Sequence, residues 1–362
     1  NKTETGEAIE TIFVSSINHQ KKANFSELFD SVKFIPLETT DDVLISGITK
    51  IHAVENRFFI FDERNQAVFA FDEEGHCIWK IRTRGGSPKE YTQLTGFDVD
   101  EDSRKIYLFS RREKILVYDF DANFLEEYKV RFDGTSIGVM NDRMYLYAYN
   151  RTNRNNGEKL KNNLLIINKG KIQQAYLPFE KESGTAFTFN SPNAFYRYND
   201  EMRLYMPFST KIYSHKGENL TVRYFFDFGR NNIPKALLEE DNFQDLLEDT
   251  NYAYGLNTYW ENRNYCSFRI SFEKGSTRIL FDKRTKEIKY GLYDDLAYCF
   301  PNIQQATDDH ATGFRDAMDL LYEAEHSNAR KEKSLLKEVV KSISEDSNPV
   351  VFIYYFKKSD GE

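Results

Sequence analysis

The sequence is poor in cysteine and has no long apolar run, and each shortage excludes a class of protein. Its three cysteines, Cys77, Cys266 and Cys299, lack the short spacings of a zinc ribbon or a redox motif. Cys77 and Cys266 fall in strand-like runs, so we expect buried free thiols there. No stretch approaches the roughly 18 apolar residues of a membrane span, and no signal peptide is recognisable.

Positive charge is also in deficit. Lys and Arg number 49 against 57 Asp and Glu, for a net charge of −8, which argues against a nucleic-acid partner. The chain opens on NKTETGEAIETI, without a methionine, as a mature or trimmed protein does. Residues 1–23 are therefore predicted to form a polar tether.

Motifs that carry catalysis or hold metals are missing as well. The six histidines show no H-x-H or H-E-x-x-H spacing, and there is no G-x-S-x-G elbow. The stretch DVDEDS (98–103) begins like a calcium loop, but Ser103 and Phe109 stand where Gly and Glu are needed, so we predict a hairpin turn. Asp308, Asp309 and His310 could ligate a metal, although a loop and helix cap is the preferred interpretation. We predict no metal and no cofactor.

Aromatic residues are abundant, with 30 Phe and 23 Tyr, and they favour strands. The segment VFAFDEEGHCIWKI (68–81) aligns without a gap with VYDFDANFLEEYKV (117–130), so that Phe71-Asp72 meets Phe120-Asp121. The first copy predicts strands at 48–53, 57–61, 67–71 and 76–81. Weaker copies cover 142–177, 201–228 and 262–291. Four short antiparallel strands in each copy are typical of a β-propeller blade.

The two ends of the chain predict how the propeller closes. Lone strands at 31–38 and 348–358 would share a sixth blade, because an open ring leaves two unpaired strand edges. We therefore predict an all-β, six-bladed β-propeller as a single domain over residues 24–362. Helices are expected at 24–31 and in inserts at about 233–250 and 314–346, the first of these capped by Ser26.

The stretch RTRGGSPKEY (82–91) lies between the first two blades. No helix follows its glycines, so no helix N-terminus is available to hold a phosphate. We expect its glycines and proline to shape the crossing between blades, with Glu90 and Tyr91 fixing it by hydrogen bonds.

Basic loops are predicted to gather on one face of blades one to three, on a chain that is acidic as a whole. Such a face would attract an anionic ligand, although exposed loops are often simply charged. The candidate binding residues are Arg64, Arg82, Arg84, Lys89, Arg111, Arg112, Arg151 and Arg154.

An outer strand followed by a Gly-rich stretch ending in Pro-x-Glu-Tyr resembles the six-bladed, NHL-like propellers of Bacteroidetes, many of them predicted lipoproteins. Gly86, Pro88, Glu90 and Tyr91 match the G-x-G-P-x-E-Y loop of that family, with Gly85 displaced by one, and Asn348-Pro349-Val350 resembles its C-terminus. The resemblance covers most of residues 31–357. It implies export to the cell envelope and a lipid anchor ahead of this sequence.

Two functions remain open at this stage. The first is a binding or scaffold module for a glycan, an anionic small molecule or a protein partner. The second is a propeller lyase or hydrolase with its site in the central channel, for which the expected inner strands offer only His52 and Asp98. The scarcity of such side chains favours binding, and fold alone does not decide between the two.

Overall fold

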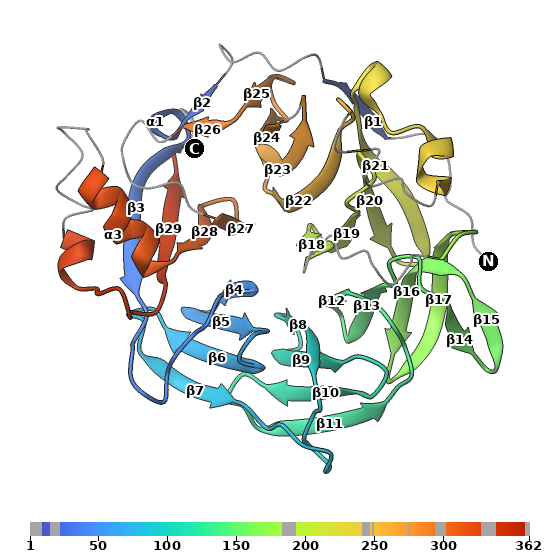
Figure 1. Cartoon of the computed structure of the whole chain (residues 1–362), viewed down its shortest axis with the longest axis horizontal. Coiled ribbons are helices and arrows are strands. Elements are labelled where there is room, and N and C mark those ends of the chain that lie inside the picture. Colours follow the sequence, from blue (N-terminus) through green and yellow to red (C-terminus); the bar gives the residue numbers. More distant parts are fainter. Residues whose placement is uncertain are drawn as a thin grey trace. The chain divides into compact units, whose positions relative to one another are not determined.

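The computed structural model describes residues 9–14, 22–182, 193–240, 247, 250–273, 275–293, 302–326 and 338–358. Within these ranges the strands form the six antiparallel sheets of a six-bladed β-propeller (Figure 1). The chain divides into two compact units. One comprises residues 1–17, 83–259 and 269–277, and the other comprises residues 18–82, 260–268 and 278–362.

The first two sheets run strand by strand in sequence order. The first contains β4 (Lys50–Val54), β5 (Arg57–Asp62), β6 (Ala67–Asp72) and β7 (Cys77–Ile81). The second contains β8 (Leu94–Asp100), β9 (Lys105–Ser110), β10 (Lys114–Asp119) and β11 (Phe124–Lys129). The four strands predicted for the first repeat are confirmed to within about two residues at each end.

The third and fourth sheets each carry an addition. The third contains β12 (Ser136–Met140), β13 (Arg143–Tyr147), β16 (Asn162–Asn168) and β17 (Lys171–Pro178), with a small hairpin of β14 (Asn153–Asn155) and β15 (Glu158–Leu160). The fourth contains β18 (Phe195–Tyr198), β19 (Glu201–Tyr205), β20 (Lys211–Lys216) and β21 (Asn219–Asp227). Strand β1 (Glu10–Phe13) pairs in parallel with β21, so the predicted tether contains a strand.

The last two sheets complete the fold. The fifth contains β22 (Tyr254–Glu261), β23 (Tyr265–Phe272), β24 (Gly275–Asp282) and β25 (Ile288–Tyr290). The sixth contains β27 (Asn302–Ala306), β28 (His310–Arg315), β29 (Val350–Phe356) and β3 (Phe29–Pro36). Strand β29 pairs with β3 in antiparallel register, from Val350↔Pro36 to Phe356↔Phe29. The predicted pairing of the two terminal strands is thereby confirmed.

The first helix is shorter than the sequence suggested. Helix α1 (Phe25–Leu28) is a single turn with Asn24 rather than Ser26 at its N-cap, because the chain enters β3 at Phe29. The 3₁₀ turn η1 (Gly229–Asn231) precedes the first predicted insert, of which the 3₁₀ turn η2 (Lys235–Glu239) is described. Of the second, α3 (Ala317–His326) is described, and residues 327–337 lie outside the described part. Two-residue strands β2 (Ala23–Asn24) and β26 (Leu292–Tyr293) pair in parallel.

The alignment of the first two repeats is wrong by two residues. Asp72 pairs with Arg57 in the first sheet, and Asp119 pairs with Lys105 in the second. The Asp72 carboxylate accepts the backbone N–H groups of Glu74 and His76, as Asp119 does two and four residues ahead. Asp72 is therefore equivalent to Asp119 and not to Asp121. A shift of two keeps every side chain on its own face of the sheet, so the alternating pattern could not reveal it.

Apolar side chains fill the space between the second and third sheets. Strands β9 and β10 contribute Tyr107, Phe109, Ile115 and Val117, and the facing strands contribute Val139, Met144, Leu165 and Ile167. This packing fixes the two sheets beside each other and so positions the loops at their ends. No helix among the described residues is both long and apolar enough to cross a membrane.

Candidate anion-binding groove

Three arginines converge on one buried carboxylate in the loops of the second and third sheets. The Asp133 side chain is 7% exposed, and its Oδ1 lies 3.6 Å from Arg111 Nε and 3.2 Å from Arg151 Nη1. Arg112 Nη2 donates to the other oxygen, Oδ2. A single negative charge therefore faces three positive charges, and the cluster keeps an excess of two.

Backbone contacts hold Asp133 in place. Its N–H donates to Asn153 Oδ1 at 2.7 Å, and Asn153 Nδ2 donates back to the Asp133 carbonyl at 2.9 Å. Asn153 is 2% exposed and begins β14. The extra hairpin β14–β15 thus positions the carboxylate around which the arginines gather.

A groove of about 780 Å³ runs beside this cluster. Its walls come from the β9–β10 turn, the end of β11 with the segment that follows it, the β14–β15 turn and the start of β17. The charged lining residues are Arg112, Glu113, Lys129, Arg131, Arg154 and Lys171. Five cations against one anion make it strongly positive on an acidic chain, and such a concave basic surface concentrates anions.

Most of these cations are available to a ligand. The side chains of Lys129, Arg131 and Lys171 are exposed and have no ion-pair or hydrogen-bond partner in the described part of the chain. Arg154 Nη1 donates to the Gly157 carbonyl at 3.0 Å, which leaves its charge unneutralised. Only Arg112 is committed to a carboxylate, and its side chain is still 69% exposed.

The one acid in the groove is engaged by neutral donors. Glu113 Oε2 accepts the Thr92 N–H at 3.0 Å, the Thr92 hydroxyl at 2.9 Å and the Ser110 hydroxyl. Partial burial acts to raise the pKa of Glu113, but the hydrogen bonds from Ser110 and Thr92 outweigh it, and the pKa is lowered. This carboxylate therefore orders the neighbouring loops rather than cancelling a groove cation.

The predicted binding residues divide into two groups. Arg112 and Arg154 line the groove, and Arg111 and Arg151 join Arg112 at Asp133. The remaining four, Arg64, Arg82, Arg84 and Lys89, do not line it.

The four predicted residues outside the groove have different surroundings. Arg64 Nη1 donates to the Ser46 carbonyl at 3.5 Å, and the Lys89 ammonium lies 5.0 Å from the centre of the Phe124 ring. The Arg82 and Arg84 side chains are exposed. Whether they bind a ligand stays a prediction.

The groove also contains three cations that the sequence analysis missed. Lys129, Arg131 and Lys171 lie at a strand end, in the crossing after β11 and at the start of β17. The available signal was the crossing segment itself, since Arg131 follows β11 as Arg82 and Arg84 follow β7. Lys171 offered no such signal, because a lysine beside a turn glycine is common in any exposed hairpin.

The stretch RTRGGSPKEY connects the first sheet to the second and is held by hydrogen bonds between its own residues, as predicted. Tyr91 is fully buried and exchanges contacts with Thr83, whose carbonyl accepts the Tyr91 N–H at 3.0 Å and whose N–H reaches Tyr91 Oη at 3.3 Å. Glu90 Oε2 accepts the Ser87 N–H at 2.9 Å. A Cβ atom at Gly85 would lie 2.0 Å from the same oxygen, so a larger residue there would displace the Glu90 carboxylate from its hydrogen bond.

Asp98 and Asp308, the aspartates considered as catalytic or metal-binding candidates, accept hydrogen bonds from backbone N–H groups. Asp98 Oδ2 accepts the Val139 N–H at 2.6 Å, which ties β8 to β12. The first half of DVDEDS ends β8, and its second half lies in the predicted turn between β8 and β9. Asp308 Oδ1 accepts the Arg263 N–H at 2.7 Å in the β27–β28 turn, and the segment leads into a strand rather than capping a helix. His52 lies in β4.

One group of metal-ligand type, Asp72, Glu74 and His76, lies within the described residues. It occupies the β6–β7 turn, where Asp72 accepts the backbone N–H of Glu74 at 3.0 Å and of His76 at 2.8 Å. Asp282 accepts the Arg284 N–H in the same way at 2.9 Å. The recurrence identifies an Asx turn, which needs no ion.

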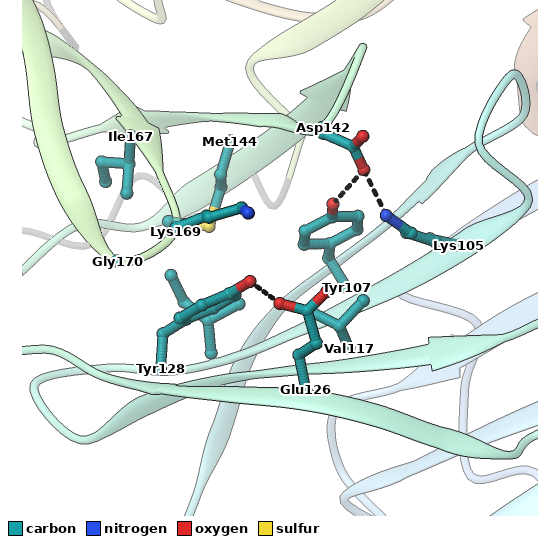
Figure 2. A pocket seen from close by; sticks show the side chains of 11 residues that line it. Lys105, Tyr107, Val117, Glu126, Tyr128, Asp142, Met144, Ile167, Lys169 and Gly170 are labelled. Carbon is teal, nitrogen blue, oxygen red and sulfur yellow. Dashed lines mark hydrogen bonds and ion pairs between the residues drawn. The ribbon is translucent and has the colours of Figure 1, made fainter.

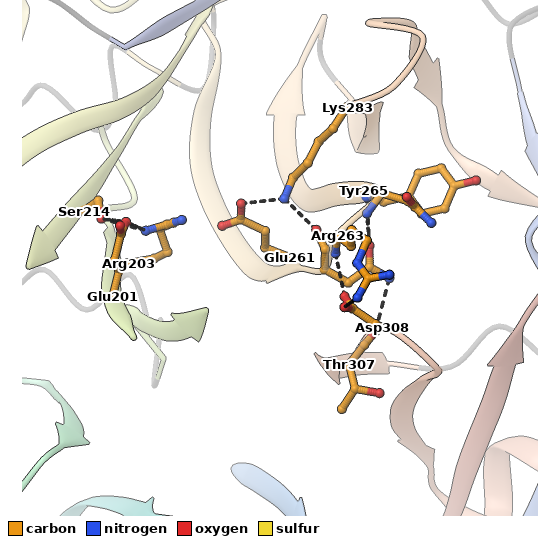
Figure 3. A network of polar contacts seen from close by, with 11 residues as sticks. Glu201, Arg203, Ser214, Glu261, Arg263, Tyr265, Lys283, Thr307 and Asp308 are labelled. Atoms are coloured by element: carbon orange, nitrogen blue, oxygen red, sulfur yellow. Dashed lines mark hydrogen bonds and ion pairs between the residues drawn. The ribbon is translucent and has the colours of Figure 1, made fainter. Parts of the chain in front are cut away.

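Two cations elsewhere in the chain are paired more completely than Lys129, Arg131 and Lys171. Arg203 Nη1 donates to Glu201 at 2.5 Å and to Ser214 Oγ at 2.6 Å (Figure 3). In the other unit, Lys283 Nζ lies 2.7 Å from Glu261 Oε1 (Figure 3). The three groove cations have no such acid beside them within the described residues.

Comparison with known proteins supports the fold. A family model described as a domain of unknown function (DUF4934) matches residues 9–355. A crystal structure of a protein from Bacteroides fragilis, described as exported, is 20% identical, with a TM-score of 0.80 over 96% of this chain and 100% of that one. A Bacteroides vulgatus member of the DUF4221 family is 12% identical, with a TM-score of 0.55 over 92% and 99% of the two chains. No curated protein sequence matches the chain.

Proposed function

The chain belongs to the DUF4934 family, and we propose that it is an exported propeller that binds an anionic ligand in the groove between its second and third sheets. The observation that carries this proposal is the lining of the groove, in which Lys129, Arg131 and Lys171 lack partners among the described residues. Adjacent cations repel one another, so an occupant of opposite charge would relieve a cost that the free protein bears.

An acidic glycan is the ligand class that we favour. Carboxylates bind arginine through paired, charge-assisted hydrogen bonds, and an oligomer would extend along a groove of about 780 Å³. Export to the cell envelope, an NHL-like subclass and a lipid anchor belong to the same proposal. Export is supported by the description of the Bacteroides fragilis protein. Fractionation of cells that express the full-length gene would test the location.

Titration calorimetry with a galacturonic acid tetramer and with neutral maltotetraose tests the groove. We expect binding of the acidic tetramer alone, weakened about tenfold when NaCl rises from about 20 to 200 mM, because salt screens exposed charges. Replacing both Lys129 and Arg131 by Ala should weaken binding by at least about a hundredfold, since each hydrogen bond to a charged group contributes roughly 1.5–3 kcal/mol.

The matched control removes two exposed arginines that lie outside the groove and are not candidate binding residues, as Arg230→Ala with Arg269→Ala. It changes the net charge equally and should leave affinity within about twofold, in keeping with the small effects of surface substitutions. Equal losses in the two double variants would show attraction by overall charge and would overturn the groove as the site.

A further inference from the structure

A second pocket, of about 120 Å³, lies between the same two sheets as the groove and has a different chemistry (Figure 2). Its base is apolar, formed by Ile115, Val117, Met144 and Ile167. Its polar rim is formed by Lys105, Tyr107, Glu126, Tyr128, Asp142 and Lys169. The charges of its two lysines and two carboxylates cancel, so the pocket has no net charge, whereas the groove is positive.

Part of the rim is internally bonded. Asp142 Oδ1 accepts Lys105 Nζ at 2.6 Å and the Tyr107 hydroxyl at 3.1 Å. The hydrogen bond from Lys105 lowers the pKa of Asp142, so this carboxylate is charged and occupied. The Tyr107 ring, 6% exposed, is thereby held as a fixed wall.

The opposite rim leaves a donor and an acceptor for a ligand. Glu126 Oε2 accepts the Tyr128 hydroxyl (Figure 2), while Glu126 Oε1 has no partner among the described residues. The Lys169 ammonium is likewise without a partner in that part of the chain, and its side chain extends into the pocket (Figure 2). Glu126 can only accept and Lys169 can only donate.

A hydroxyl group can both donate and accept, so neighbouring hydroxyls on one ring would satisfy Glu126 and Lys169 together. The aliphatic face of such a ring would contact the tyrosine rings and the apolar base, as expected of a pocket with a few convergent polar groups. Because the rim has no net charge, it does not favour an anion over a neutral group. The lining therefore suits a neutral sugar unit.

The pocket and the groove meet at one turn. Asn168-Lys169-Gly170-Lys171 joins β16 to β17, and Gly170 lines both cavities. Lys169 faces the pocket and Lys171 faces the groove. Gly170 has φ +71°, and a Cβ there would lie 2.9 Å from Tyr128 Cβ, so the turn approaches the tyrosine as closely as glycine allows.

From this junction we infer that the two cavities hold one ligand, an acidic saccharide whose anionic unit occupies the groove and whose adjoining neutral sugar occupies the tyrosine pocket. The inference rests on the proposed function of the groove and adds to it the identity of the neighbouring unit. Tyr107, Glu126, Tyr128 and Lys169 would select that unit.

The test compares methyl glucuronide with disaccharides in which glucuronic acid is joined to glucose, galactose, xylose or rhamnose. Titration calorimetry should show at least one disaccharide binding about tenfold tighter than the monosaccharide, as two added hydrogen bonds would give. Glu126→Gln and Lys169→Met should each remove most of that gain and leave methyl glucuronide binding unchanged.

Lys171→Met is the matched control, because it removes the same charge two residues away on the groove side. It should weaken the monosaccharide and the disaccharide by the same factor. Circular dichroism and the unfolding midpoint would establish that each variant is folded.

The possible failures are distinguishable. If methyl glucuronide binds and Lys171→Met weakens it, but no disaccharide binds tighter or the gain survives Glu126→Gln and Lys169→Met, the inference is overturned and the groove stands. If free alanine or leucine binds and Lys169→Met abolishes this, the pocket takes a zwitterion and the inference is also wrong. If neither the glucuronide nor any disaccharide binds, both proposals fail.

Discussion

The Asp133 cluster and the groove beside it share Arg112, but their other cations have opposite surroundings. Arg111, Arg112 and Arg151 all contact one carboxylate that is 7% exposed. Lys129, Arg131 and Lys171 contact no acid within the described ranges. The number of basic residues in a set of loops therefore does not give the charge available to a ligand, because one buried acid can engage several arginines.

The contrast also separates stability from binding. The buried Asp133 carboxylate joins three loops through its arginines, so its loss should lower the free energy of unfolding. Exposed cations without partners contribute little to the free energy of unfolding, so their loss should weaken the binding of an anion and leave stability nearly unchanged.

The largest effect is expected from Asp133→Ala. It removes the shared partner of three guanidinium groups and leaves their mutual repulsion, so the free energy of unfolding should fall by about 2–4 kcal/mol. Urea denaturation at pH 7 measures this loss. The control Glu158→Ala, at an exposed acid of β15, should change stability by less than about 0.5 kcal/mol. Equal losses in the two variants would mean that Asp133 has no organising role.

A smaller loss of stability is expected from Arg151→Met, and almost none from Lys171→Met. Arg151 is 24% exposed and contacts Asp133 at 3.2 Å, so Arg151→Met should cost about 1 kcal/mol of unfolding free energy. Lys171→Met removes one of several like charges and should leave stability within about 0.5 kcal/mol of the wild type, or raise it slightly. Thermal unfolding at low salt resolves the two. A larger loss at Lys171 than at Arg151 would reverse the assignment of these cations.

The sequence predicts the fold better than the site for a physical reason. Strand periodicity and turn residues are local, so β4 to β7 and the pairing of β29 with β3 could be predicted. The repeat register failed by two residues because side-chain alternation is blind to such a shift. Whether a cation is free depends on acids distant in sequence: Asp133 is separated from Arg111 by more than 20 residues. Composition alone could not distinguish the structural arginines from the available cations.

The smallest effect concerns Glu113, the acid that lies in the groove but is bonded to Ser110 and Thr92. Those hydrogen bonds lower its pKa below the ordinary value of 4.5. Its contribution to stability is therefore fully present above pH 4.5 and is lost as the pH falls through the lower pKa of the folded state. Glu113→Gln should reduce stability at pH 7 by less than about 1 kcal/mol, since the group is partly exposed. The difference from the wild type should shrink as the pH is lowered below 4.5, as measured by urea denaturation at each pH. A difference that grows on acidification would mean that Glu113 is paired with a groove cation in solution, and the groove would then offer one charge fewer to its ligand.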